Sequence, residues 1–125
     1  MGRVLLVGAS WPERALLNAQ LAASGHEVRA FDNGRAALQM LVRQPWQPEV
    51  VVVVDLSRLS WNREVWRDLR ALVTGAPLVV LADSLGISPD VEAALRPMVS
   101  LRRPVRIQDV VDVVQRLLVP RETSP

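Results

Sequence analysis

The sequence predicts an α/β fold in which five parallel strands form one doubly wound sheet with helices on both faces, a three-layer α/β/α arrangement. Three observations carry this prediction. Short apolar runs alternate along the 125 residues with segments that have apolar residues at helical spacing. Five consecutive valines at 50–54 indicate a strand buried on both faces, as at the centre of a parallel sheet. Half of the residues are hydrophobic and 22% are charged, which suits one ordinary core.

The elements follow one another in regular βα order. Strands are expected at 4–7, 28–31, 50–54, 78–82 and 99–101. Helices are expected between 10 and 25, between 34 and 45, over about 63–73, from 88 onward, and over 107–118. We therefore expect one domain over 1–119, followed by a polar tail or linker at 120–125.

Helix start and stop signals support this order. Ser10 stands where a helix cap is expected, and Glu13 follows three residues later, as in a capping box. Leu16 contributes to the predicted apolar face of that first helix. Pro45 stops the second helix, and a Ser-Pro-Asp sequence at 88–90 starts the fourth.

Composition excludes several classes of function. Cysteine is absent, so disulfides, thiolate catalysis and cysteine-based zinc sites are all excluded. The net charge is only +2, and the high isoelectric point of about 10.9 arises because all fifteen basic residues are arginine. Direct nucleic-acid binding is therefore not expected. No apolar run approaches the roughly 20 residues of a membrane span, and the amino-terminal segment lacks the pattern of a secretory signal, so we expect a cytoplasmic protein.

Ligands of doubly wound sheets bind at the carboxyl ends of the strands. The residues that follow the predicted strands are Gly8, Ala9, Ser10, Asp32, Asp55, Asp83, Ser84 and Arg103. We expect any functional site to be built from these residues.

Several segments in this order resemble the receiver domain of bacterial response regulators, which has a flavodoxin-like fold. The resemblance is carried by the sequences SGHEV at 24–28, AFDNGRAAL at 30–38 and APLVVL at 76–81, and by the Arg-Pro pair at 103–104. Asp55 follows the third strand, where the family has its phosphoacceptor aspartate. The resemblance covers about residues 3–118 and implies a signalling module of a two-component system or phosphorelay.

The sequence departs from the family where the phosphorylation chemistry takes place. The family has magnesium-binding acids after the first strand, but Gly8, Ala9 and Ser10 stand here. The expected hydroxyl residue falls on Ala82, and Arg103 replaces a lysine. Because phosphoryl transfer to aspartate needs a metal to neutralise charge, we expect magnesium binding to be lost. The chain is then interpreted as a pseudo-receiver with no bound cofactor and no enzymatic activity, in which Arg103 forms an ion pair with Asp55.

Two other functions are weighed against this interpretation. One is an authentic phosphoacceptor response regulator that uses Asp55. The other is a small nucleotide-binding domain of the Rossmann type. In that case Gly8 would belong to a phosphate-binding loop, and Asp32 would bind the ribose. The segment after Gly8 lacks the further glycines that let a backbone approach pyrophosphate.

A pseudo-receiver would work by binding proteins, with a histidine kinase or a downstream signalling protein as the expected partner. Trp11 and Trp61 lie in loops at the predicted site and are candidate partner contacts, whereas Trp46 and Trp66 are expected to be packing residues. The family resemblance implies a homodimer through the fourth helix, fifth strand and fifth helix. Val113 and Leu117 would widen the apolar face of the last helix for such a contact, with packing against the core as the alternative. His26 is predicted to be a solvated loop residue.

Overall fold

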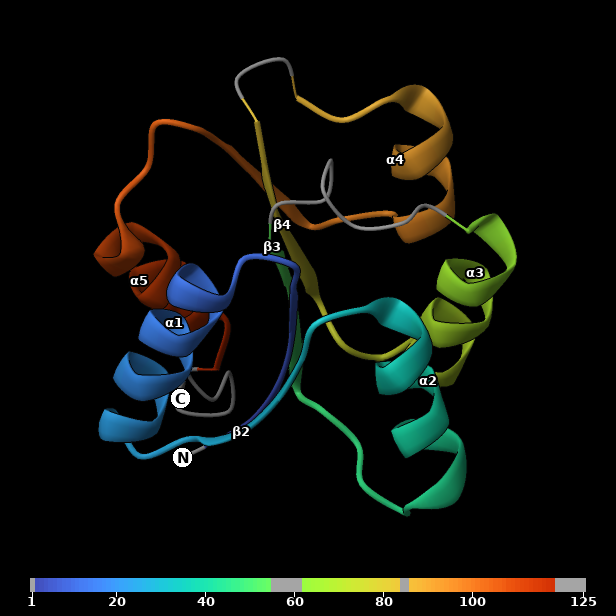
Figure 1. Cartoon of the computed structure of the whole chain (residues 1–125), viewed down its shortest axis with the longest axis horizontal. Coiled ribbons are helices and arrows are strands. Elements are labelled where there is room, and N and C mark those ends of the chain that lie inside the picture. The colour runs from blue at the N-terminus through green and yellow to red at the C-terminus, as the bar shows by residue number, and fades with distance from the viewer. Residues whose placement is uncertain (1, 55–61, 84–85, 119–125) are drawn as a thin grey trace, which may run out of the picture.

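The structure is a computed structural model that describes residues 2–54, 62–83 and 86–118. In that part of the chain, five parallel strands form one sheet in the order β2-β1-β3-β4-β5 (Figure 1). The strands are β1 (Arg3–Gly8), β2 (Glu27–Phe31), β3 (Val50–Val54), β4 (Leu78–Ala82) and β5 (Val99–Arg102). The helices are α1 (Trp11–Ala23), α2 (Gly34–Arg43), α3 (Arg63–Leu72), α4 (Pro89–Leu95) and α5 (Ile107–Leu118). The predicted fold class is confirmed, and each predicted strand agrees with the structure to within one residue at either end.

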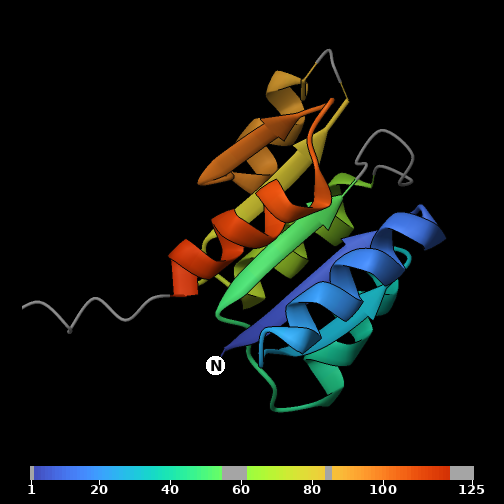
Figure 2. The ribbon, with the colours of Figure 1, turned by 90° about the vertical axis from the view of Figure 1, so that its left-hand side faces the viewer.

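Two helical layers enclose the sheet. Helices α1 and α5 cover one face, and α2, α3 and α4 cover the other (Figures 1 and 2). Side chains alternate accordingly along β1, where Val4 and Leu6 face the α1 side and Leu5 and Val7 face the α2 side. All five valines of β3 are buried, as expected for the central strand. None of the described helices is long and apolar enough to cross a membrane.

Trp66 and Trp46 are both buried, with 1% and 7% of their surface exposed, which confirms that they are packing residues. Trp66 extends from α3 onto the first residue of α2. A Cβ atom added to Gly34 would lie only 3.0 Å from Cζ2 of the Trp66 ring. Glycine is therefore what allows the indole to lie against the α2 backbone, and this contact positions α2 beside α3.

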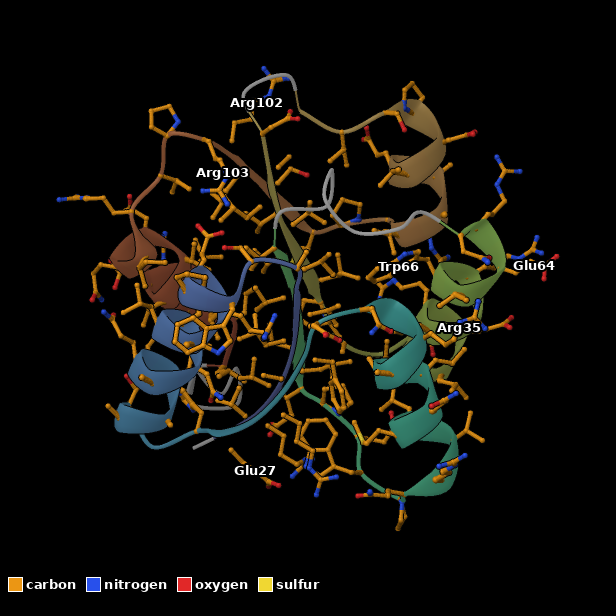
Figure 3. All side chains as sticks on the ribbon, viewed as in Figure 1. Glu27, Arg35, Glu64, Trp66, Arg102 and Arg103 are labelled. Atoms are coloured by element: carbon orange, nitrogen blue, oxygen red, sulfur yellow. The ribbon has the colours of Figure 1, made fainter. Side chains whose placement is uncertain are left out.

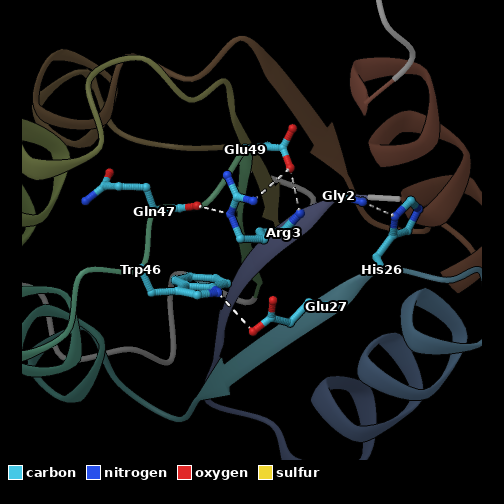
Figure 4. A network of polar contacts seen from close by, with 7 residues as sticks. All are labelled: Gly2, Arg3, His26, Glu27, Trp46, Gln47 and Glu49. Carbon is cyan, nitrogen blue, oxygen red and sulfur yellow. Dashed lines mark hydrogen bonds and ion pairs between the residues drawn. The ribbon is translucent and has the colours of Figure 1, made fainter.

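A network of polar contacts lies at the end of the sheet where the strands begin (Figure 4). The indole Nε1 of Trp46 donates a hydrogen bond of 3.0 Å to Glu27. The Arg29 guanidinium lies over the same ring, 4.7 Å from its centroid. These contacts tie the segment that enters β3 to the edge strand β2.

The prediction that His26 is a solvated loop residue is wrong. His26 is buried, and its Nδ1 accepts a hydrogen bond of 3.0 Å from the backbone nitrogen of Gly2 (Figure 4). Its Nε2 lies 2.5 Å from Oε1 of Gln115 on α5. Since Nδ1 accepts a hydrogen bond, it carries no hydrogen; Nε2 carries the ring hydrogen and donates a hydrogen bond to Gln115. The imidazole thus joins the start of β1 to α5, which no local sequence signal indicated.

Leu16, predicted to lie on the apolar face of the first helix, is 53% exposed instead. In α1 the core face is already filled by Leu17 and Leu21, which are one turn apart. Apolar spacing alone did not show how narrow the buried stripe of this helix is.

Strand β5 is an edge strand with two different faces. Val99 and Leu101 pack against the core beneath α1 and α5, whereas Ser100 and Arg102 are exposed. Val113 and Leu117 of α5 are half-buried and pack against the same core. Both side chains therefore contribute to the core and remain partly exposed. A partner contact through Val113 and Leu117 stays a prediction.

Candidate functional site

The carboxyl ends of the strands bring three of the predicted site residues, Gly8, Ala82 and Arg103, to one edge of the sheet. Gly8, the last residue of β1, pairs in register with Val54 at the end of β3. Ala82, the last residue of β4, pairs with Arg102. The backbone nitrogen of Arg103 then donates to the carbonyl of Ala82 at 3.1 Å. The backbone of Arg103 is therefore anchored beside the end of β4.

An arginine lies at the end of β1, where the receiver family would have magnesium-binding acids. Nη1 of Arg14 donates a hydrogen bond of 2.5 Å to the carbonyl oxygen of Gly8. Helix α1 begins at Trp11, so Arg14 lies in its first turn and its side chain reaches back to the strand. A Cβ atom at Gly8 would come within 3.3 Å of Val54 Cβ, so there is little room here for a larger residue. The carbonyl oxygen of Gly8 is thus bonded to a cation.

Arg103 and Glu13 form a bidentate ion pair across the same edge. Nη1 of Arg103 donates to Oε2 of Glu13 at 2.8 Å, and Nη2 donates to Oε1. The side chains are 32% and 16% exposed, so the pair is largely shielded from water. Parallel guanidinium–carboxylate bonds of this kind are strong and directional. The pair joins the start of α1 to the loop after β5 (Figure 3).

The expected capping box at the start of α1 does not form. Ser10 occupies the N-cap position with extended backbone angles, but its side chain accepts no cap hydrogen bond. Glu13 is bound to Arg103 and not to the backbone of Ser10. Glu13 pairs with Arg103 because a bidentate, charge-assisted contact is stronger than the single hydrogen bond that Glu13 would make in a capping box.

Arg102 adds a third cation at this edge. Its guanidinium lies against Gly86, where a Cβ atom would be 3.0 Å from Nη2. Gly86 has φ +84°, a left-handed conformation that glycine adopts without strain. Gly86 therefore lies directly against an exposed arginine.

The remaining predicted site residues differ in burial, and some lie outside the described part of the chain. Ala82 is buried at the end of β4 and offers no hydroxyl group. Ala9 and Ser10 are half-buried, and Trp11 is 68% exposed at the start of α1. Asp55, Trp61 and Ser84 lie outside the described residues, so the predicted ion pair between Asp55 and Arg103 stays a prediction.

Sequence analysis missed two residues of this site. Glu13 was assigned to a cap and Arg14 to no role, yet both turn toward the strand ends. Their spacing of three and four residues from Ser10 places them on the first turn of α1. That spacing was the only available signal, because the partner of Glu13 is 90 residues away in the sequence.

The described residues do not fit a magnesium ion. Magnesium requires near-octahedral oxygen ligands and is usually held by one or two carboxylates. Here Gly8 is bonded to Arg14, and Glu13 is bonded to Arg103. No group of three or more histidine, cysteine or acidic residues capable of holding a metal is found in the part of the chain that the structure describes.

No protein-family model and no curated protein matches this sequence. Solved structures do match its fold. A response regulator from Thermotoga maritima has a TM-score of 0.71 at 16% identity, covering 96% of this chain and 99% of that one. A response regulator receiver protein from Sinorhizobium medicae has a TM-score of 0.70 at 21% identity, covering 93% of each chain.

The signal receiver domain of a modulated diguanylate cyclase from Desulfovibrio desulfuricans has a TM-score of 0.72 at 20% identity, covering 100% of this chain and 99% of that domain. The likeness extends over nearly the whole of both chains in each case. Together with the strand order β2-β1-β3-β4-β5, these matches show that the chain has the fold of a response regulator receiver domain.

Proposed function

We propose that this chain is a receiver-like signalling module that acts by binding proteins, without magnesium-dependent phosphorylation of Asp55. The observation that carries the proposal is the hydrogen bond from Arg14 to the Gly8 carbonyl at the end of β1. Aspartyl phosphorylation needs a divalent metal to offset the charge that gathers on the phosphoryl oxygens. A fixed arginine on the carbonyl opposes the approach of that metal.

The ion pair between Glu13 and Arg103 supports the same proposal. In this pair the arginine already has a carboxylate partner, and the carboxylate is not available as an open metal ligand. The pair also connects α1 to the loop after β5 without a phosphoryl group. A contact that forms without phosphorylation suits a constitutive binding surface better than a phosphorylation switch.

Trp11 supplies a surface for such binding. Its side chain is 68% exposed, at the start of α1 and one turn from Glu13 and Arg14. Exposed tryptophans are frequent energetic centres of protein interfaces. We propose a signalling protein, a histidine kinase or a downstream effector, as the partner at this edge.

The proposal is tested with a small-molecule phosphodonor and with beryllofluoride, each with and without MgCl₂. We expect no mass increase and no magnesium-dependent change in the amide signals of Gly8 and Arg14, since Arg14 blocks the carbonyl ligand. Asp55→Asn serves as the control. A saturable change in the wild type that is lost in this variant would establish the alternative, an authentic phosphoacceptor.

A second expectation concerns self-association through α4, β5 and α5. If this face pairs two copies, exposed Asp112 and Arg116 on α5 would form charge pairs at its rim. Arg116→Glu should then weaken the dimer about tenfold or more in sedimentation velocity experiments, since it places like charges together. Arg67→Glu on the exposed side of α3 is the matched control. The expected dimer is independent of phosphodonor, and a wild type that is monomeric at all concentrations contradicts it.

A further inference from the structure

A second candidate site lies at the other end of the sheet, where β4 and β5 begin. A cavity of about 520 Å³ opens there between the last turn of α3, the turn that enters β4, and the segment that enters β5. Its lining includes Arg70, Ala76, Pro77, Arg96, Met98 and Leu117. This cavity is separate from the edge that carries Arg14 and Arg103, so its role is independent of the proposed function.

Arg70 is the unusual residue of this cavity. Only 8% of its surface is exposed, which is rare for an arginine without an acidic partner. Nη1 donates to the carbonyls of Val73 and Ala76 at 3.1 Å and 2.8 Å, and Nη2 makes a long contact of 3.5 Å with the Arg96 carbonyl. All three acceptors are neutral. Among the described residues no carboxylate forms an ion pair with Arg70, and its buried Nε has no hydrogen-bond partner.

Arg96 brings a second positive charge to the same cavity. It ends α4 in a left-handed conformation, with φ 46° and ψ 60°, which turns its carbonyl toward Arg70. Burial, followed by repulsion from Arg96, lowers the pKa of the Arg70 guanidinium. Two like charges therefore line one cavity, and the more buried of them retains one hydrogen-bond donor, Nε, without a partner. A bound anion would reduce both the repulsion between the two guanidinium groups and the free-energy cost of burying Arg70 without an acidic partner.

We propose that this cavity binds an anionic small molecule, with a phosphate or carboxylate group held between Arg70 and Arg96. Guanidinium groups recognise both kinds of oxyanion through paired N–H donors. Met98, which is 57% exposed, and half-buried Leu117 form an apolar wall beside the charges. The ligand therefore carries its charge at one end and an apolar portion at the other.

The test is a titration of the full chain, followed by amide and arginine Nε–H signals in nitrogen–proton spectra. The probes are sodium phosphate and sodium hexanoate, each compared with sodium chloride at equal ionic strength. We expect a saturable shift of the Arg70 Nε–H and of the amide of Gly75, which also lines the cavity, with at least one oxyanion and not with chloride. The two probes distinguish a phosphate ligand from an apolar carboxylate.

Arg96→Gln removes the exposed cation of the cavity and leaves Arg70 in place. It should weaken binding about tenfold, since one charge-assisted contact is lost. Arg67→Gln, on the exposed side of α3, changes net charge equally and should bind as the wild type does. Arg70→Lys, which keeps the charge but loses the planar fork, should also weaken binding.

The variants also separate a ligand role from a structural one. Without anions, Arg96→Gln should unfold at the same temperature as the wild type or higher, because it removes the repulsion on Arg70. Equal shifts in the wild type and in Arg96→Gln, equal shifts with chloride, or no saturable shift with either oxyanion would each overturn the proposal.

Discussion

Replacement of Trp66 by alanine is expected to lower the free energy of unfolding by about 3–5 kcal/mol. Trp66 is 1% exposed, and its indole lies against the backbone of Gly34 at the start of α2. Alanine would remove most of the side chain and leave a cavity between α2 and α3, because the closely packed backbone cannot collapse fully into the space. Urea unfolding followed by far-ultraviolet circular dichroism measures the effect without relying on tryptophan fluorescence.

Trp11 provides the matched control, because the same residue type stands there with 68% of its surface exposed. Trp11→Ala should change the free energy of unfolding by less than about 0.5 kcal/mol. If Trp11 is a partner contact, this variant should reduce binding while the fold remains intact. Equal destabilisation by the two substitutions would show that the assigned packing role of Trp66 is wrong.

Glu13→Ala is expected to cost about 1.5–3 kcal/mol, the second largest effect. The substitution removes both acceptors of a bidentate pair and leaves the Arg103 guanidinium, which is 32% exposed, without this partner. The result also bears on the proposed function, because the pair connects α1 to the end of β5. Chemical denaturation of wild type, both single variants and the double variant Glu13→Ala/Arg103→Ala yields the coupling energy.

The exposed pair between Arg63 and Asp90 is the control for this cycle. Its atoms approach to 2.9 Å, but the side chains are 55% and 69% exposed. Its coupling energy should lie between about 0.2 and 1 kcal/mol and should fall as salt is added. The Glu13–Arg103 coupling should be larger and less sensitive to salt. Equal coupling in the two cycles would mean that shielding from water gives the inner pair no advantage.

Periodicity and composition were sufficient to predict the architecture. The five valines of β3 indicated the central strand, and the alternation of strand and helix patterns required parallel pairing with right-handed connections. The packing roles of Trp46 and Trp66 were also correct. These predictions succeed because the burial of apolar surface depends on how apolar residues are spaced within a segment. That spacing can be recognised from neighbouring residues in the sequence.

Polar contacts were decided by the tertiary structure. Glu13 and Arg103 are 90 residues apart, and His26 and Gln115 are 89 apart, so neither pairing follows from local spacing. The side chain of Arg70 is buried with its Nε lacking a partner, although it lies on an otherwise amphipathic helix. A hydrogen bond or ion pair requires two groups at a defined distance and angle, and loops and helix ends set that geometry only when the sheet is assembled. The sequence by itself therefore determined the parallel sheet and the βα order of its elements along the chain, while the pairing of charges at both ends of the sheet depended on the folded chain.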